Sequence, residues 1–154
     1  MSNPLPVTII MIEDDLGHAR LIEKNIRRAG ISNHITHFEN GTAALEFLFD
    51  TANNPAGDTT GDPARHGPVL ILLDLNLPDM SGTAVLSQIK EHPRLHRTPV
   101  VVLTTTDDKV EIQRCYDLGC NVYITKPVNY ESFAEAIRQL GLFLSVIQIP
   151  ETGG

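Results

Sequence analysis

Five polar side chains with the chemistry to act on a phosphoryl group stand at the ends of apolar segments in this sequence. Two acids end the first segment, a third acid ends the most apolar one, and a hydroxyl and an ammonium end two more: Glu13, Asp14, Asp74, Thr104 and Lys126. Three carboxylates within a few ångströms repel one another, and a hard divalent cation with oxygen ligands relieves that repulsion. The sequence therefore predicts a Mg²⁺ site, in which Mn²⁺ or Ca²⁺ can substitute.

A magnesium site of this kind is open to phosphate. Mg²⁺ usually takes one or two protein carboxylates and completes its octahedron with water and phosphate oxygens. A carboxylate beside the cation can act as a nucleophile toward phosphorus, and Asp74 is the central candidate for that role. The Lys126 ammonium and the Thr104 hydroxyl can stabilise the charge on the equatorial oxygens. We therefore expect Asp74, Thr104 and Lys126 to carry the reaction.

These side chains meet only if the apolar segments form one sheet. Continuous apolar runs predict strands at 7–12, 35–39, 69–73, 99–103 and 121–125. Amphipathic spacing with capping and stop residues predicts helices at 16–29, 42–50, 82–91, 107–118 and 130–147. This alternation implies an α/β fold, a doubly wound parallel sheet with right-handed crossovers and helices on both faces. Ligands bind such sheets at the carboxyl ends of the strands.

Two segments depart from the alternation. Residues 51–68 are dominated by Asn, Asp, Gly, Pro and Thr, which predicts an exposed inserted loop rather than a linker. Residues 141–154 form a C-terminal extension that is more apolar than a free terminus, and exposed apolar patches usually mark an interface. We expect a symmetric homodimer that buries this extension, although packing of the extension on its own domain is the alternative.

Composition and charge argue against several other classes of protein. The formal charge of -7 and a longest basic cluster of only Arg27 and Arg28 argue against a nucleic-acid surface. No stretch approaches the roughly 20 apolar residues of a membrane helix, and the start lacks a secretory signal, so we expect a cytoplasmic protein. Cys115 and Cys120 do not match a metal or redox spacing and are expected to be reduced thiols. The six histidines show no pair at metal-ligand spacing, and we assign none of them a role.

Four motifs carry a resemblance to a known family. They are Ile-Glu13-Asp14-Asp, Leu-Leu-Asp74-Leu-Asn76-Leu-Pro78, Leu-Thr104-Thr105 and Ile-Thr-Lys126-Pro127. Through them the chain resembles bacterial two-component receiver domains from residue 7 to about residue 140. The resemblance implies a flavodoxin-like sheet of five strands in the order 2-1-3-4-5, within a single receiver domain that spans residues 1–154.

The resemblance also assigns roles to individual residues of the metal site. It makes Asp74 the phospho-acceptor and Glu13 and Asp14 the acidic pair that binds the metal with it. It makes Asn76 a metal ligand through the backbone carbonyl.

A second group of implied roles concerns a switch. Thr104 and Lys126 become the groups that sense phosphate, and the Lys126–Pro127 bond is cis in the family. Tyr123 matches the aromatic position whose ring turns inward when Thr104 moves toward the phosphate. Phosphorylation then acts as a population shift that changes the face formed by the last predicted strand and the helices on either side of it. This face, with the C-terminal extension, is where we expect the homodimer to form.

The implied function is that of a response regulator in a two-component phosphorelay. Asp74 accepts a phosphoryl group from a sensor histidine kinase, and because no output domain follows the last predicted helix, we expect signalling through protein contact. The long loop, the apolar extension and the stretch 40–48, Asn-Gly-Thr-Ala-Ala-Leu-Glu-Phe-Leu, also resemble the small regulators paired with bacterial and cyanobacterial phytochromes, which implies a phytochrome-type kinase. We do not expect an enzyme, although receivers slowly phosphorylate and dephosphorylate themselves at rates that Asn76 and Thr106 tend to set.

Other interpretations of these residues stay open. An aspartyl-nucleophile phosphohydrolase is the alternative function, but such enzymes typically carry a second aspartate two residues on, where this chain has Asn76. A nucleotide-binding module is disfavoured because no glycine-rich phosphate loop follows any predicted strand. Asp15 is either a third metal ligand or the cap of the next helix, and we favour the cap.

Overall fold

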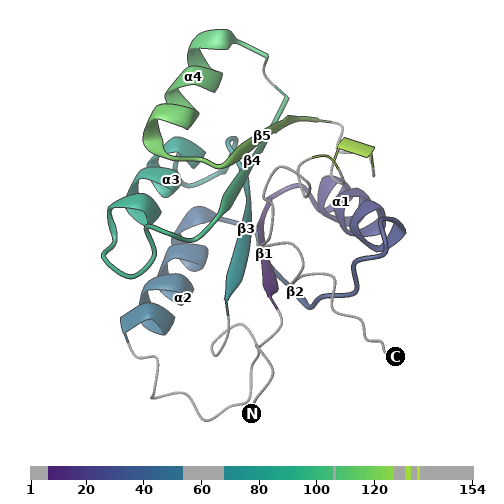
Figure 1. The fold of residues 1–154 in the computed structure, drawn as a ribbon, viewed down its shortest axis with the longest axis horizontal. Coiled ribbons are helices and arrows are strands. Elements are labelled where there is room, and N and C mark those ends of the chain that lie inside the picture. Colours follow the sequence, from purple (N-terminus) through teal and green to yellow (C-terminus); the bar gives the residue numbers. More distant parts are fainter. Residues whose placement is uncertain (1–6, 54–67, 106, 127–130, 133–134, 136–154) are drawn as a thin grey trace.

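The computed structural model describes residues 7–53, 68–105, 107–126, 131–132 and 135, in which strands and helices alternate along the chain (Figure 1). The strands are β1 (Thr8–Ile12), β2 (Ile35–Phe38), β3 (Val69–Asp74), β4 (Val100–Thr104) and β5 (Val122–Thr125). The helices are α1 (Leu16–Arg28), α2 (Gly41–Asn53), α3 (Gly82–Glu91) and α4 (Lys109–Leu118). None of these helices is long and apolar enough to cross a membrane.

The strands form one parallel sheet in the order β2-β1-β3-β4-β5, which confirms the predicted fold class and strand order. From β1 the chain goes to one neighbour, β2, and then crosses to the other neighbour, β3. This reversal creates a switch point at the carboxyl ends of β1 and β3, where ligands bind in doubly wound sheets. The register pairs Ile12 with Leu73, so Glu13 and Asp74 follow at the same level on adjacent strands.

Helices cover both faces of the sheet, with α1 on one face and α2, α3 and α4 on the other (Figure 1). Because side chains alternate along a strand, β1 contributes to both layers. Ile9 and Met11 pack in the α1 layer, and Ile10 and Ile12 pack in the other. All four are at most 1% exposed, and burial of a side chain of this size contributes roughly 1.5 to 3 kcal/mol. The loops at the carboxyl edge therefore start from a firmly packed base.

Capping side chains fix the starts of three helices close to these strand ends. Asp15 accepts a hydrogen bond from the backbone N–H of His18 at the start of α1, and this bond is the main reason that the pKa of Asp15 is lowered. Ser81 and Asp108 cap α3 and α4 in the same way. Asp15 therefore takes the capping position that the sequence favoured. At the other end of α4, Gly119 has a φ of 108°, a left-handed conformation that glycine adopts without strain.

The predicted boundary between α2 and the inserted loop was wrong. α2 continues to Asn53, past its predicted end at residue 50, so the loop predicted at 51–68 starts later. The prediction ended the helix where the polar residues begin. The helix continues because Phe49 and Ala52 pack against the core and the Asn53 side chain contacts His92. Residues 54–67 of that loop lie outside the described part of the chain.

The other predicted bounds agree with the structure to within about two residues. Apart from residues 131–132 and 135, which are helical, the predicted helix 130–147 lies outside the described residues. The C-terminal extension 141–154 lies outside them as well.

Asp79 ties the loop after β3 to the start of α2. Its carboxylate accepts hydrogen bonds from the backbone N–H groups of Gly41 and Thr42, at 2.9 and 2.7 Å, and from the Thr42 hydroxyl. These bonds, led by the one from the Thr42 hydroxyl, lower the pKa of Asp79 to about 2. A negative charge is also favourable at a helix N-terminus. The segment that leaves the sheet after Asp74 is thereby held against α2.

We expect Asp79→Asn to lower stability at neutral pH, by an amount that shrinks in acid. An aspartate with a lowered pKa stabilises the folded state above its unfolded pKa, near 3.8, and this contribution is lost as the pH falls toward 2. Urea unfolding midpoints of the two proteins, measured from pH 7 down to pH 3, test this expectation. A difference that is the same at every pH would mean that the fold does not favour the ionised carboxylate.

Candidate functional site

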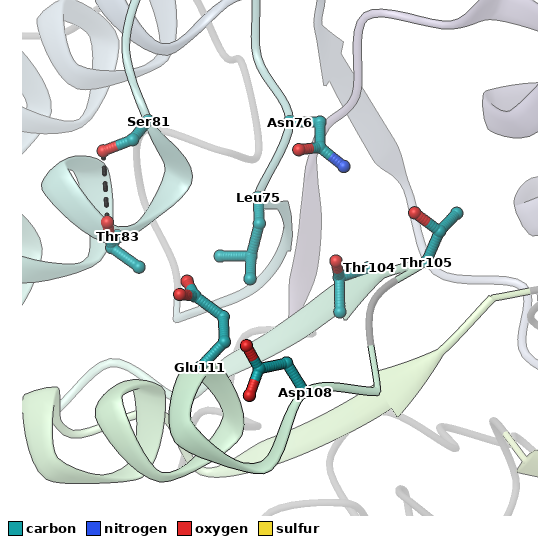
Figure 2. Close-up of a pocket in the computed structure, with 8 residues that line it drawn as sticks. All are labelled: Leu75, Asn76, Ser81, Thr83, Thr104, Thr105, Asp108 and Glu111. Carbon is teal, nitrogen blue, oxygen red and sulfur yellow. Dashed lines mark hydrogen bonds between the residues drawn. The ribbon is translucent and has the colours of Figure 1, made fainter.

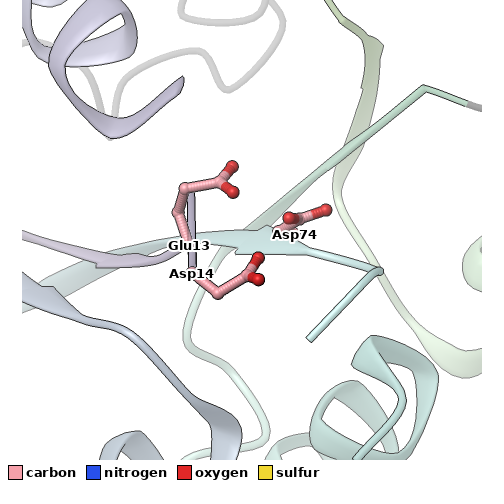
Figure 3. Close-up of side chains that lie close together, drawn as sticks. All are labelled: Glu13, Asp14 and Asp74. Carbon is pink, nitrogen blue, oxygen red and sulfur yellow. The ribbon is translucent and has the colours of Figure 1, made fainter. Parts of the chain in front are cut away.

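Glu13, Asp14 and Asp74 come together at the switch point. One carboxylate oxygen from each residue lies within 4.8 Å of those from the other two. Glu13 and Asp74 are buried, whereas Asp14 is exposed. Figure 3 shows Glu13 and Asp14 reaching from the end of β1 toward Asp74 at the end of β3. The structure therefore brings together the three acids that the sequence analysis placed in one cluster.

Lys126 enters this cluster from the end of β5. Its Nζ donates to Glu13 Oε1 at 2.6 Å and lies 3.4 Å from Asp74 Oδ2. The Lys126 side chain is only 8% exposed, so solvent screens these contacts weakly. Its backbone N–H donates to the Thr104 carbonyl at 2.7 Å, which fixes the end of β5 beside the end of β4. One ammonium thus compensates two buried carboxylates.

The electrostatics of this cluster favour a bound cation. Burial raises the pKa of Glu13, the hydrogen bond from Lys126 opposes that rise, and the nearby Asp74 carboxyl adds to it. Lys126 therefore offsets only part of the cost of ionising Glu13. A divalent cation among the three oxygens would stabilise their ionised forms. A donor set made only of oxygens, with one exposed member, suits a hard ion that keeps water ligands.

Thr104 and Tyr123, the proposed switch residues, are in contact. Thr104 is buried at the end of β4, one residue beyond Leu103, which pairs with Asp74. Tyr123 lies on the neighbouring strand β5 and is half-buried. Burial raises the pKa of the Tyr123 phenol, and a hydrogen bond with the Thr104 side chain acts in the opposite direction. A change at Thr104 would therefore be felt directly by Tyr123.

A polar hollow of about 420 Å³ opens beside Thr104, between the β3–α3 loop and the start of α4 (Figure 2). Its lining combines hydroxyl, amide and carboxylate side chains with one leucine: Leu75, Asn76, Ser81, Thr83, Thr104, Thr105, Asp108 and Glu111. The Asn76 backbone N–H, at the edge of this hollow, donates to Asp74 Oδ1 at 3.1 Å. The residue predicted as a metal ligand through its backbone is thus bonded to the central acid.

Gly82 allows the loop after Asp74 to fold back tightly. Its N–H donates to the Leu75 carbonyl at 2.9 Å, and Asn76 forms an isolated antiparallel bridge with Ser81. A Cβ at Gly82 would lie 2.5 Å from Leu75 Cα and 2.6 Å from the Asp74 carbonyl oxygen. Backbone atoms cannot give way as a flexible side chain can, so this close approach requires glycine.

Two histidines that the sequence analysis left without a role also reach the site. His18 Nδ1, in the first turn of α1, lies 3.2 Å from Lys126 Nζ. His37 Nε2, on β2, lies 2.6 Å from the Glu13 carbonyl oxygen. A search for metal-ligand spacing could not find them; the available signal for His18 was its place in the first helical turn after the acids. Pro127 and Thr106 lie outside the described residues.

The sequence matches the response regulator receiver domain family over residues 9–138. The chain belongs to this family. The matched span contains the whole cluster of acids together with Thr104, Tyr123 and Lys126. As a receiver domain, the protein is a signalling component of a two-component system.

Similar proteins agree with this assignment. A receiver domain from Rhodospirillum rubrum is 64% identical, and its solved structure matches with a TM-score of 0.71 over 96% of this chain and 100% of that one. The response regulator Rcp1 of Synechocystis sp. is 35% identical over 150 residues, which cover 97% of this chain and 96% of Rcp1. The structure of its Mn²⁺-bound form matches with a TM-score of 0.69 over 95% of this chain and 100% of that one, at 32% identity. The phosphorylated cyanobacterial phytochrome response regulator RcpA is 31% identical, with a TM-score of 0.68 over 95% of this chain and 99% of that one.

Proposed function

We propose that this receiver domain accepts a phosphoryl group on Asp74 from a sensor histidine kinase, in a reaction that requires Mg²⁺. The observation that carries the proposal is the cluster in which three acids meet the ammonium of Lys126. A single acid at a strand end is most simply a capping or loop residue. Asp74 instead is buried, faces two further carboxylates and lies beside the Lys126 ammonium, which is the environment of a reactive acid.

Magnesium fits this donor set. Glu13, Asp14 and Asp74 offer oxygen ligands close enough to share one ion, and we propose the backbone carbonyl of Asn76 as a further ligand. Bound Mg²⁺ would supply positive charge that neutralises the acids and the oxygens of the incoming phosphoryl group. Mn²⁺ and Ca²⁺ accept similar oxygen ligands, and the relative Rcp1 has an Mn²⁺-bound form.

Asp74 is placed to act as the nucleophile. One of its carboxylate oxygens would form the bond to phosphorus while the bond from phosphorus to the imidazole nitrogen of the kinase phosphohistidine breaks. That nitrogen keeps the electron pair and takes up a proton. Lys126 Nζ, 3.4 Å from Asp74 Oδ2, is positioned to pair with the phosphoryl oxygens, and the buried Thr104 hydroxyl supplies a hydrogen bond.

The hydrogen bond between Thr104 and Tyr123 links the acceptor to the surface. We propose that Thr104 turns toward the phosphoryl oxygens, that it then gives up its hydrogen bond with Tyr123, and that Tyr123 moves inward. Tyr123 belongs to β5, which packs beside α4, so the surface formed by α4 and β5 changes with it. Phosphorylation would shift the population between two arrangements of this surface rather than create a new one.

We further propose a phytochrome-type histidine kinase as the partner, with the exchange taking place in the cytoplasm. The relative RcpA is a phytochrome response regulator and matches 95% of this chain. Slow self-catalysed phosphorylation and dephosphorylation would be the only reactions of the domain by itself. For this pairing we expect a purified phytochrome kinase to transfer its phosphoryl group to the protein faster than an unrelated histidine kinase does.

The face made by α4 and β5 is where we propose that a homodimer forms, together with the C-terminal extension 141–154. Val110 and Tyr116 on α4 leave 77% and 45% of their surface exposed, which is apolar area that association would cover. Sedimentation at micromolar concentrations distinguishes this dimer from a monomer in which the C-terminal extension packs on its own domain.

Removal of the metal tests the proposed reaction without the kinase. With acetyl phosphate and Mg²⁺ we expect one phosphoryl group to be added, seen by intact mass and mapped to Asp74. In EDTA the reaction should be at least about a hundredfold slower, because the charge that offsets the clustered oxygens is lost. Asp14→Asn should need more Mg²⁺ for the same rate. Equal rates with and without EDTA, or modification of another residue, would contradict the proposal.

A further inference from the structure

The Lys126 ammonium has a third neighbour besides the two acids. His18 Nδ1 lies 3.2 Å from Nζ, between the 2.6 Å of Glu13 Oε1 and the 3.4 Å of Asp74 Oδ2. An ammonium can donate three hydrogen bonds and cannot accept any. If Nδ1 bears no proton, the ammonium faces three acceptors, with Glu13 Oε1 and Nδ1 at hydrogen-bond distance and Asp74 Oδ2 as an ion-pair contact.

The distances indicate where the proton of the imidazole ring lies. A proton on Nδ1 would face the ammonium at 3.2 Å. The carboxylate oxygens near Nδ1, Glu13 Oε2 and Asp15 Oδ2, are 3.9 and 4.0 Å away, beyond hydrogen-bond distance. The favourable arrangement therefore has an unprotonated Nδ1 that accepts from Lys126 and a proton on Nε2.

The backbone around His18 fixes the position of its ring. The His18 N–H donates to Asp15 Oδ1 at 3.0 Å, and the Asp15 N–H donates to Glu13 Oε2 at 3.1 Å. The start of α1 is thus bonded to the acidic cluster itself. Although the His18 side chain is 47% exposed, the helix that carries it is held in register with the acceptors of Lys126.

We propose that His18 is a positioning residue for phosphoryl transfer, which acts by accepting a hydrogen bond from Lys126. The inference rests on the function proposed for Asp74. During that reaction Glu13 turns to the cation and Asp74 is modified, so both carboxylate partners of Lys126 change. His18 is the acceptor that does not change. It holds Nζ at the mouth of the site, ready for the phosphoryl oxygens, instead of letting the lysine follow Glu13 or move into solvent.

Three variants at this position test the role of Nδ1. Asn places an amide oxygen close to where Nδ1 lies, Gln places one close to Nε2, and Phe keeps the ring but has no acceptor. With acetyl phosphate at saturating Mg²⁺, we expect His18→Phe and His18→Gln to react about fivefold more slowly than the wild type and His18→Asn to recover most of the rate. The affinity for Mg²⁺ should stay within about twofold in all three, because His18 acts on Lys126. A wild-type rate for His18→Phe, or no recovery with Asn, would overturn the proposal.

Nitrogen NMR of His18 gives a readout that does not depend on phosphorylation. We expect Nδ1 of the wild type to be an unprotonated acceptor and Nε2 to carry the proton, and we expect the Nδ1 resonance to shift when Lys126 is replaced by Met. A proton on Nδ1, or a resonance that Lys126→Met does not move, would refute the inference even if Asp74 is phosphorylated normally. If the wild type is not phosphorylated at all, the proposed function fails, while this measurement still decides whether His18 holds Lys126.

Discussion

Asp74→Asn is expected to slow phosphoryl acceptance at least about a thousandfold, because the substitution removes the nucleophile itself. No other acid of the cluster is placed to replace it. Glu13 already pairs with Lys126 at 2.6 Å, and Asp14 is exposed and forms no ion pair with Lys126 within the described part of the chain. The measurement is intact mass after reaction with acetyl phosphate at saturating Mg²⁺. Unchanged labelling of the variant would refute Asp74 as the acceptor.

The neighbouring Asp15 provides the matched control for this experiment. Asp15 follows the acidic pair directly, but its side chain caps α1 by accepting from the His18 N–H. Asparagine caps helices about as well as aspartate, so Asp15→Asn should fold and react like the wild type. Asp74→Asn should fold as well, since it removes one of the like charges beside Glu13. A similar loss in both variants would show that the assay senses any lost acid near β1 and not the acceptor.

Lys126→Met is expected to destabilise the metal-free protein by about 3 to 5 kcal/mol, the range for breaking a buried ion pair. The Lys126 side chain is 8% exposed, and its partners Glu13 and Asp74 are 0% and 3% exposed. Methionine has a similar length and preserves most of the packing, so the loss reports the uncompensated carboxylates. Urea unfolding in EDTA measures it, and Lys24→Met, at an exposed position on α1, should change stability little.

The effects of Mg²⁺ and of pH on the stability of Lys126→Met distinguish the loss of the Lys126 charge from the loss of its packing. Mg²⁺ should stabilise Lys126→Met more than the wild type, because lysine and cation compete for Glu13 in the wild type. The destabilisation should also grow with pH. Burial raises the folded pKa of Glu13 above its ordinary value of 4.5, and loss of Lys126 raises it further. The contribution of Glu13 to stability is therefore most favourable below pH 4.5 and is lost as the pH rises through the folded pKa. A loss that depends on neither Mg²⁺ nor pH would show that packing alone is affected.

The sheet could be predicted because its inner strands are buried on both faces. A run such as 69–73 contains only aliphatic residues, and its alternation with amphipathic helices leaves a doubly wound parallel sheet as the simplest arrangement. The order of strands is not contained in such local patterns, since nothing in residues 35–39 states which neighbour they pair with. That order followed from the family motifs.

The site was predictable where it depends on strands and not where it depends on helix starts and loops. Parallel strands end at one edge, so Glu13, Asp74 and Lys126 were expected at the same edge of the sheet, and the family motifs placed them in one site. The contact of His18 with Lys126 depends on how the cap orients the first turn of α1. The bonds from α2 to Asp79 join segments that are distant in sequence and carry no periodic signal.

The backbone that contacts the Asp74 carboxylate can take its position only because Gly82 has no Cβ atom. The approach is between backbones, so even a methyl group would force the start of α3 away from Leu75. The bridge between Ser81 and Asn76 would be disturbed with it, and the Asn76 N–H is the group that donates to Asp74 Oδ1. Transplanting this chemistry into another parallel sheet would therefore require the hairpin-like return as well as the acids. A graft of the polar residues alone would reproduce the composition of the site but not the loop that orients Asp74.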